Sequence, residues 1–123
     1  MTLFIHVPRD ATPETLWHMC LDYNWDDGFA FPQAIADHPN CDLAVALELF
    51  WLSNAISIYL GEVSNGAYNA DWRCFCSSIT QRILSGHYVQ GATSFQVPLT
   101  KVQIYKYRKL GVPSLLLGGS WSV

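Results

Sequence analysis

The chain has 123 residues, enough for one domain with a buried core, and half of them are apolar. Only 14% are charged, against about 25% in an average domain, so much of the surface must be uncharged. The net charge of −3 and the small number of bases argue against direct nucleic-acid binding.

The charges are divided unevenly along the chain. All ten acids lie between Asp10 and Asp71, and six of the seven bases follow from Arg73 onward. Residues 1–71 therefore carry a net charge of −9 and residues 72–123 a net charge of +6. Such a division predicts either an acidic face for a basic partner protein or attraction between two halves of one fold.

The first residues carry no recognisable export signal. MTLFIHVPRD has neither a cationic start nor a long apolar run. The longest apolar stretch, residues 43–60, includes Glu48 and Asn54 and fits a buried helix better than a membrane span. We therefore expect a cytoplasmic protein that does not contact a membrane and whose four cysteines are reduced.

We predict an all-α fold, a compact single-domain bundle of about five helices. A short extended N-terminal arm covers 1–11 and the helical body covers 12–123. The first helix spans 13–24, because Thr12 is a good N-cap and Pro13 fits the first helical position.

A short helix is expected at 31–37, and Pro39 ends it. A third helix, 41–60, is capped by Asn40 or Asp42. It is apolar on nearly all sides and should be the central element of the bundle. The connection between these two helices is similar to those that join paired helices in helical-repeat proteins.

Two more helices complete the prediction. The fourth spans 70–85 and ends near Gly86, with an apolar inner stripe that includes Phe75 and Ile79. The last spans 99–110 and is expected to turn inward the residues Leu99, Val102, Tyr105 and Leu110. The apolar tail that follows should dock on the body.

The stretch YNWDDGF, residues 23–29, lies between the first two helices and combines aromatic side chains with adjacent acids. We expect Trp25 to fold under this loop as a lid on the core, with Asp26 accepting hydrogen bonds from backbone amides. Structural roles are therefore assigned to Trp25, Asp26, Gly28, Pro39 and Cys41.

The remaining acids around this loop are candidates for a docking surface. If the first and third helices pack antiparallel, their loops gather at one end of the bundle. Acids beside aromatic side chains suit a protein that covers a basic cleft, because complementary charge speeds encounter and aromatic rings anchor the contact. The predicted partner-binding residues are Asp22, Tyr23, Asp27, Asp37 and Asp42.

Two other kinds of chemistry remain open. Asp26 and Asp27 could act with His18 or His38 as metal ligands or as an acid–base pair. The adjacent acids lack the alternate spacing of a calcium loop, and the CFC pair at 74–76 would lie about 200° apart on a helix, too far to chelate one zinc ion. We therefore expect no metal and no cofactor.

NWDDGF, followed by PQAIADHPNCDLAVALELFWL, resembles a bacterial family of small cytoplasmic proteins classified only as a domain of unknown function. The resemblance covers most of residues 14–119. The chain departs from the family pattern at Ala44 and Val45, where a Gly-Thr pair is usual. Members resemble in size and setting the small proteins encoded beside bacterial toxins, which implies an immunity role by analogy.

Three functions follow as hypotheses. The first is a non-enzymatic protein-binding domain, in its specific form an immunity protein that neutralises a toxin by occlusion. The second is a small enzyme or metal-binding protein that uses the aspartates. The third is a structural homo-oligomer, a homodimer in the simplest case, which the low charge content allows.

Overall fold

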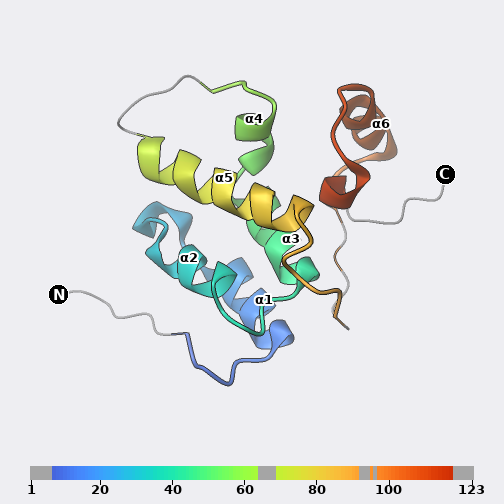
Figure 1. Cartoon of the computed structure of the whole chain (residues 1–123). Coiled ribbons are helices and arrows are strands. Elements are labelled where there is room, and N and C mark those ends of the chain that lie inside the picture. Colours follow the sequence, from blue (N-terminus) through green and yellow to red (C-terminus); the bar gives the residue numbers. More distant parts are fainter. Residues whose placement is uncertain (1–6, 64–68, 92–94, 96, 118–123) are drawn as a thin grey trace.

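The computed structural model describes residues 7–63, 69–91, 95 and 97–117, and throughout these ranges regular structure is helical (Figure 1). The predicted all-α fold is therefore confirmed. No helix in the described ranges is long and apolar enough to cross a membrane. The α-helices are α1 (Pro13–Asp22), α2 (Ala30–Ala36), α3 (Leu43–Leu52), α4 (Ala55–Tyr59), α5 (Ala70–Leu84) and α6 (Lys101–Lys109). Short 3₁₀ helices include η1 (Trp25–Asp27) and η3 (Ser114–Leu117).

The helix starts follow local capping chemistry. Thr12 accepts a hydrogen bond from the Thr15 backbone N–H, as expected for the N-cap of α1. Thr100 and Gln103 form a reciprocal capping box at the start of α6. Asp42 caps α3 by accepting from the Val45 N–H at 3.0 Å.

Helix α3 is the central element, as its all-round apolar pattern predicted. It packs against α1, α2, α4 and α5, and Val45, Leu49 and Phe50 are completely buried. In Figure 1, α5 crosses the bundle with α1 and α2 on one side and α4 on the other. Buried residues from all six α-helices and η3 join in a single core cluster.

The prediction of one helix over 41–60 is wrong, because the chain turns between α3 and α4. Asn54 has a φ of 58°, a left-handed conformation that Asn tolerates better than most residues. The Ser53 carbonyl accepts a hydrogen bond of 2.6 Å from the Trp72 indole N–H. This long-range bond from α5 compensates the backbone acceptor at the break.

The predicted inward face of the last helix is also wrong in part. Val102, Tyr105 and Leu110 are among the most exposed large apolar side chains, while Ile104 is buried. Tyr107 packs against Trp51 with ring centroids 6.0 Å apart. Only a narrow stripe of the helix is buried. Apolar residues occur every few positions on more than one side of the helix, so their spacing does not show which side faces the core.

The described part of the tail docks on the body, as expected. Leu116 and Leu117 of η3 are completely buried, and η3 packs against α5. The Leu116 carbonyl accepts a hydrogen bond of 2.9 Å from the Trp51 indole N–H. Residues 118–123 lie outside the described ranges.

The predicted extended arm, 1–11, lies mostly outside the described residues. Its described portion, 7–11, contains a turn in which the Ala11 N–H donates to the Pro8 carbonyl. The buried His38 ring holds this turn, with Nε2 2.7 Å from the same Pro8 oxygen. The start of the helical body is thus tied to the connection between α2 and α3.

Candidate functional site

Trp25 lies in a cluster of aromatic rings at one end of the bundle. Its ring packs edge-on against Tyr23, Phe29 and Phe75, with centroids 5.7 to 6.1 Å apart. Edge-to-face pairs of this kind each contribute about 0.5–1.5 kcal/mol beyond the area they bury. Because Phe75 belongs to α5 and is buried, the cluster anchors the loop after α1 to the core.

Hydrogen bonds between side chains and the backbone hold the same loop. The Tyr23 hydroxyl donates to the Gly28 carbonyl at 2.8 Å, and Asn24 Oδ1 accepts from the Asp26 N–H at 3.1 Å. Gly28 adopts a φ of 97°, which only glycine reaches without strain. The expected loop-holding carboxylate of Asp26 is therefore a misassignment, because Asn24 makes that bond.

Three carboxylates project from this fixed loop. Asp22 ends α1, and Asp26 and Asp27 belong to η1. All three residues are exposed, and none of their carboxylates has a hydrogen bond or ion pair within the described part of the chain. Burial raises the pKa of Tyr23, and the Asp27 charge raises it further. We call Asp22, Asp26 and Asp27 the acidic edge.

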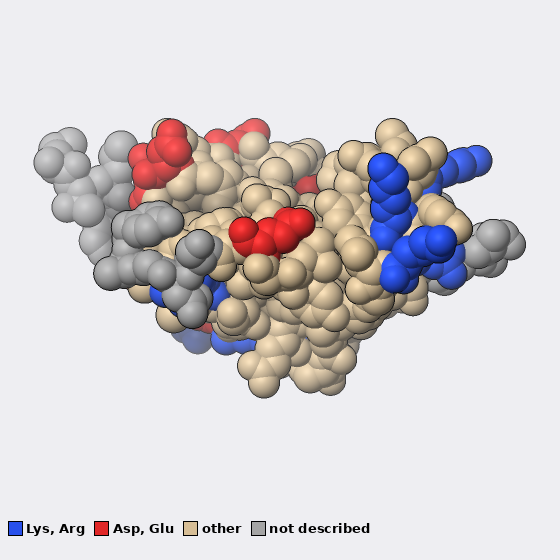
Figure 2. Space-filling view, turned by 90° about the horizontal axis from the view of Figure 1, so that it is seen from above, with Lys and Arg blue, Asp and Glu red and all other residues tan. Residues whose placement is uncertain are grey.

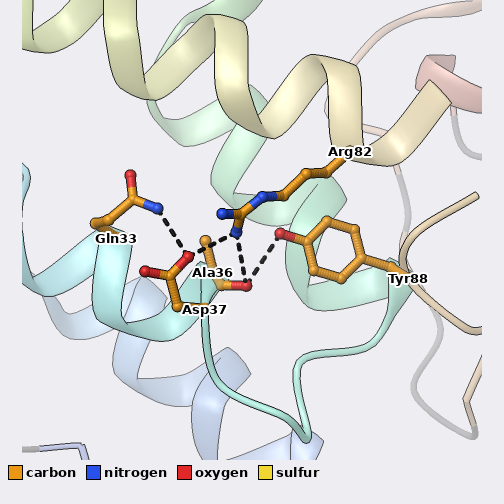
Figure 3. Close-up of polar contacts among 5 residues, drawn as sticks. All are labelled: Gln33, Ala36, Asp37, Arg82 and Tyr88. Atoms are coloured by element: carbon orange, nitrogen blue, oxygen red, sulfur yellow. Dashed lines mark hydrogen bonds and ion pairs between the residues drawn. The ribbon is translucent and has the colours of Figure 1, made fainter. Parts of the chain in front are cut away.

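Asp37 is half exposed but, unlike the acidic edge, it is paired within the fold. It accepts hydrogen bonds from Arg82 Nη1 at 2.6 Å and from Gln33 Nε2 at 2.9 Å (Figure 3). The Tyr88 hydroxyl donates to the Ala36 carbonyl at 3.0 Å in the same cluster. Hydrogen bonds to Tyr88 and Asp37 raise the pKa of Arg82, so its charge is secure.

The assignment of Asp42 to a docking surface is wrong. Only 2% of this residue is exposed, because it lies at the N-terminus of α3 beneath Gly91. One carboxylate oxygen caps the helix, while Oδ2 is buried and has no hydrogen-bond partner. A Cβ at position 91 would overlap the same carboxylate, so any larger residue there would force the Asp42 side chain to shift.

The alternative acid–base or metal site does not assemble in the described ranges. Both ring nitrogens of His38 contact backbone groups, at Pro8 and Asn40. His18 lies on the exposed face of α1, 3.9 Å from Glu14. No group of three or more His, Cys, Asp or Glu side chains there converges to hold a metal ion.

Three of the four cysteines are placed as small, buried apolar side chains. Cys20, Cys41 and Cys76 are buried and unpaired, and Cys74 is exposed on α5. Burial raises the pKa of the Cys76 thiol to about 11 and that of Cys41 to about 12, and it also raises that of Cys20. Thiols of this kind remain protonated and unreactive at neutral pH.

Two further features escaped the sequence reasoning. Glu48, on the otherwise apolar α3, accepts a hydrogen bond of 2.6 Å from the Trp17 indole N–H. A surface groove of about 560 Å³ runs between α4 and α5, lined in part by Tyr59 and Leu84. The partner of Glu48 lies 31 residues away, so only the three-dimensional packing reveals the contact.

Comparison with known proteins places the chain in a family. The family model described as "Domain of unknown function (DUF4274)" matches residues 11–84. The chain belongs to this family. The match contains the acidic edge, the Trp25 lid and Asp37, but it ends at the last residue of α5 and leaves out α6 and η3. No curated protein and no solved structure gives a significant match.

Proposed function

We propose that the chain is a non-enzymatic protein-binding domain whose acidic edge docks on a basic surface of another protein. The observation that carries the proposal is the combination of three exposed, unpaired carboxylates with a loop held by hydrogen bonds to its backbone. Charged groups that steer a partner work best on a surface that loses little conformational freedom when it binds. The aromatic cluster beneath the loop packs it against the core and so limits its conformational freedom.

The position of Asp22 gives independent support. It is the last residue of α1, where the negative end of the helix dipole disfavours an acid by about 0.3–1 kcal/mol. Asp26 and Asp27 follow within one short loop, so the three charges repel one another. Acids held where they weaken the fold are expected when they serve a binding function.

The specific form of this proposal is an immunity protein that occludes a basic cleft of a bacterial toxin. Support for it comes from the resemblance to small proteins encoded beside toxins, and from the small, rigid acidic surface, which suits blocking rather than catalysis. Cytoplasmic residence is part of the same proposal. The enzyme alternative has less support, because His38 is occupied by backbone contacts.

The test is capture of partners by the tagged chain from the cells that produce it, followed by affinity measurements on a partner that is recovered. Replacing Asp22, Asp26 and Asp27 by Asn removes three charges without removing a side-chain hydrogen bond. We expect affinity to fall about tenfold or more at low salt, mainly through a slower association rate.

The matched control removes three exposed acids elsewhere, by Asp10→Asn, Glu62→Gln and Asp71→Asn. This control should retain most of the affinity although its net charge changes equally. Equal losses in both variants would reduce the effect to net charge, and an unchanged affinity in the edge variant would rule out the acidic edge as the docking surface.

A further inference from the structure

Helix α6 carries a concentrated positive charge that has no partner in its own chain as described. Lys101, Lys106, Arg108 and Lys109 lie on it, and it contains no acid. Across the described ranges, no ion pair links these cations to a carboxylate. Lys109 instead lies over the Tyr105 ring, with its Nζ 5.3 Å from the ring centroid. The positive charge of α6 is therefore available to an outside group.

The outward side of α6 also has an apolar centre. Val102 is 63% exposed and Tyr105 59% exposed, and at helical spacing of three they lie side by side. Lys101, Lys106 and Lys109 surround this pair on the same side of the helix. We call these five residues the α6 face. Apolar side chains within a rim of charge are the usual composition of a protein-binding surface.

The α6 face and the acidic edge lie apart on the molecule. Figure 1 places α6 on one flank and α1 with α2 toward the other. In Figure 2, one group of blue side chains lies on the flank that holds α6, away from most of the visible red ones, and further blue atoms are visible on the opposite flank. The two surfaces therefore do not neutralise each other within one chain.

We infer that the α6 face binds the acidic edge of a second copy of this chain. This inference rests on the proposed function, because the acidic edge is one half of the contact. The two surfaces match in composition. Three unpaired carboxylates accompany the half-buried Tyr23 and Trp25 and the exposed Leu21, and unpaired cations surround Val102 and Tyr105.

Charge and apolar area together favour a second copy over other occupants. A membrane would need a broader apolar stripe, whereas α6 has nine residues and its outward side is mostly cationic. The acidic edge is an exposed surface of opposite sign. Because every copy of the chain carries both surfaces, each α6 face always has an acidic edge available on another copy. Because α6 lies beyond the family match, the contact would be an addition to the family domain.

The experiment measures solution mass by light scattering across protein concentration at low and high salt. We expect masses above the 13.8 kDa of one chain at about 50 mM salt. The mass should return to 13.8 kDa near 1 M salt, where the Debye length shrinks to about 3 Å. A mass that stays at one chain at low salt and high concentration would overturn the inference.

Charge reversal identifies the surfaces. One variant carries Lys101→Glu, Lys106→Glu and Lys109→Glu, and the other carries Asp22→Lys, Asp26→Lys and Asp27→Lys. Each alone should remain monomeric, because its two surfaces now have the same sign. An equimolar mixture should associate again, because the unchanged acidic edge of the first variant meets the unchanged α6 face of the second, and the two reversed surfaces also have opposite signs. Self-association that persists in either variant alone would contradict the proposed contact.

Three readouts separate the remaining outcomes. Melting temperatures of both variants near that of the native chain would show that they fold. If the charge-reversed α6 variant does not fold, Lys→Gln replacements at the same positions take its place. Sedimentation with phosphatidylserine vesicles that depends on these lysines, in a chain that stays monomeric, would assign α6 to a membrane instead. Partner capture that is lost in the edge variant of such a monomer would retain the proposed function and eliminate only self-association.

Discussion

Asp42 has one carboxylate oxygen that is bonded and one that is not. Oδ1 accepts the Val45 N–H at the start of α3, while Oδ2 is buried without a partner against Gly91. An N-cap contributes about 1 kcal/mol, and an unpaired buried polar atom costs about 1–3 kcal/mol. The two effects oppose each other within a single side chain.

Substitutions at this position can separate the two effects. Asp42→Ser retains a capping oxygen and removes the unpaired one, whereas Asp42→Ala removes both. We expect the Ser variant to have a free energy of unfolding about 1 kcal/mol above that of the Ala variant, measured by urea denaturation. An Ala variant as stable as the Ser variant would show that the cap contributes nothing.

The acids around the loop 23–29 also show how much of a single residue's role a sequence can predict. The aromatic and acidic composition of 23–29 is what drew attention to this end of the bundle. Sorting the acids required distances. Asp37 pairs with Arg82, which lies 45 positions away, and no local sequence pattern predicts that contact. Asp42 was recognisable as a cap from the apolar run that follows it, and that role should have removed it from the surface set.

Asn54 decides how the longest apolar segment is divided into elements. The periodicity of residues 43–60 allows one continuous helix, and local propensity contains no stop signal as strong as Gly or Pro. The turn depends on the left-handed backbone of Asn54 and on the bond from Trp72 to the Ser53 carbonyl. Tertiary contacts thus override a local preference for continuing the helix.

We expect the left-handed backbone to reverse the usual order of Gly and Ala. Asn54→Gly should be more stable than Asn54→Ala by about 1 kcal/mol, because glycine adopts a φ of 58° without the steric cost of a Cβ. Thermal or urea unfolding of the two variants measures the difference. At Gln81, an exposed position inside α5, the same pair should show the opposite order, since Ala is favoured over Gly in a regular helix. If the Ala variant were more stable than the Gly variant at both positions, residue 54 would not need the left-handed backbone conformation.

Helix α6 shows why the sequence predicted an element but not its orientation. Its end followed from Gly111, whose capping signal is local, whereas its predicted start at 99 lies two residues before the observed one, which Thr100 caps. Its buried side depends on Trp51 and Tyr107 meeting across more than 50 positions of chain. Exposed Val102 and Tyr105 look like core residues in any pattern of hydrophobicity, so the α6 face emerged only from burial.

At the scale of the whole molecule, the hydrophobic core extends beyond the residues that the family model matches. The match ends at Leu84, yet Ile104, Val112, Leu116 and Leu117 join the same core as residues from α1. Trp51 of α3 donates its indole N–H to the Leu116 carbonyl. The C-terminal segment therefore completes the core of the family domain in this chain.

This arrangement predicts that the C-terminal segment unfolds together with the rest. Leu116→Ala opens a cavity at a completely buried site and should lower the free energy of unfolding by about 2–5 kcal/mol. Leu110→Ala, at a residue that is 66% exposed, should change it by no more than about 0.5 kcal/mol. Urea denaturation followed by tryptophan fluorescence and by far-ultraviolet circular dichroism should give one coincident transition in each variant. An early transition of small amplitude in Leu116→Ala, with the main midpoint unmoved, would instead show that α6 and η3 unfold as a separate unit on a domain that ends with α5.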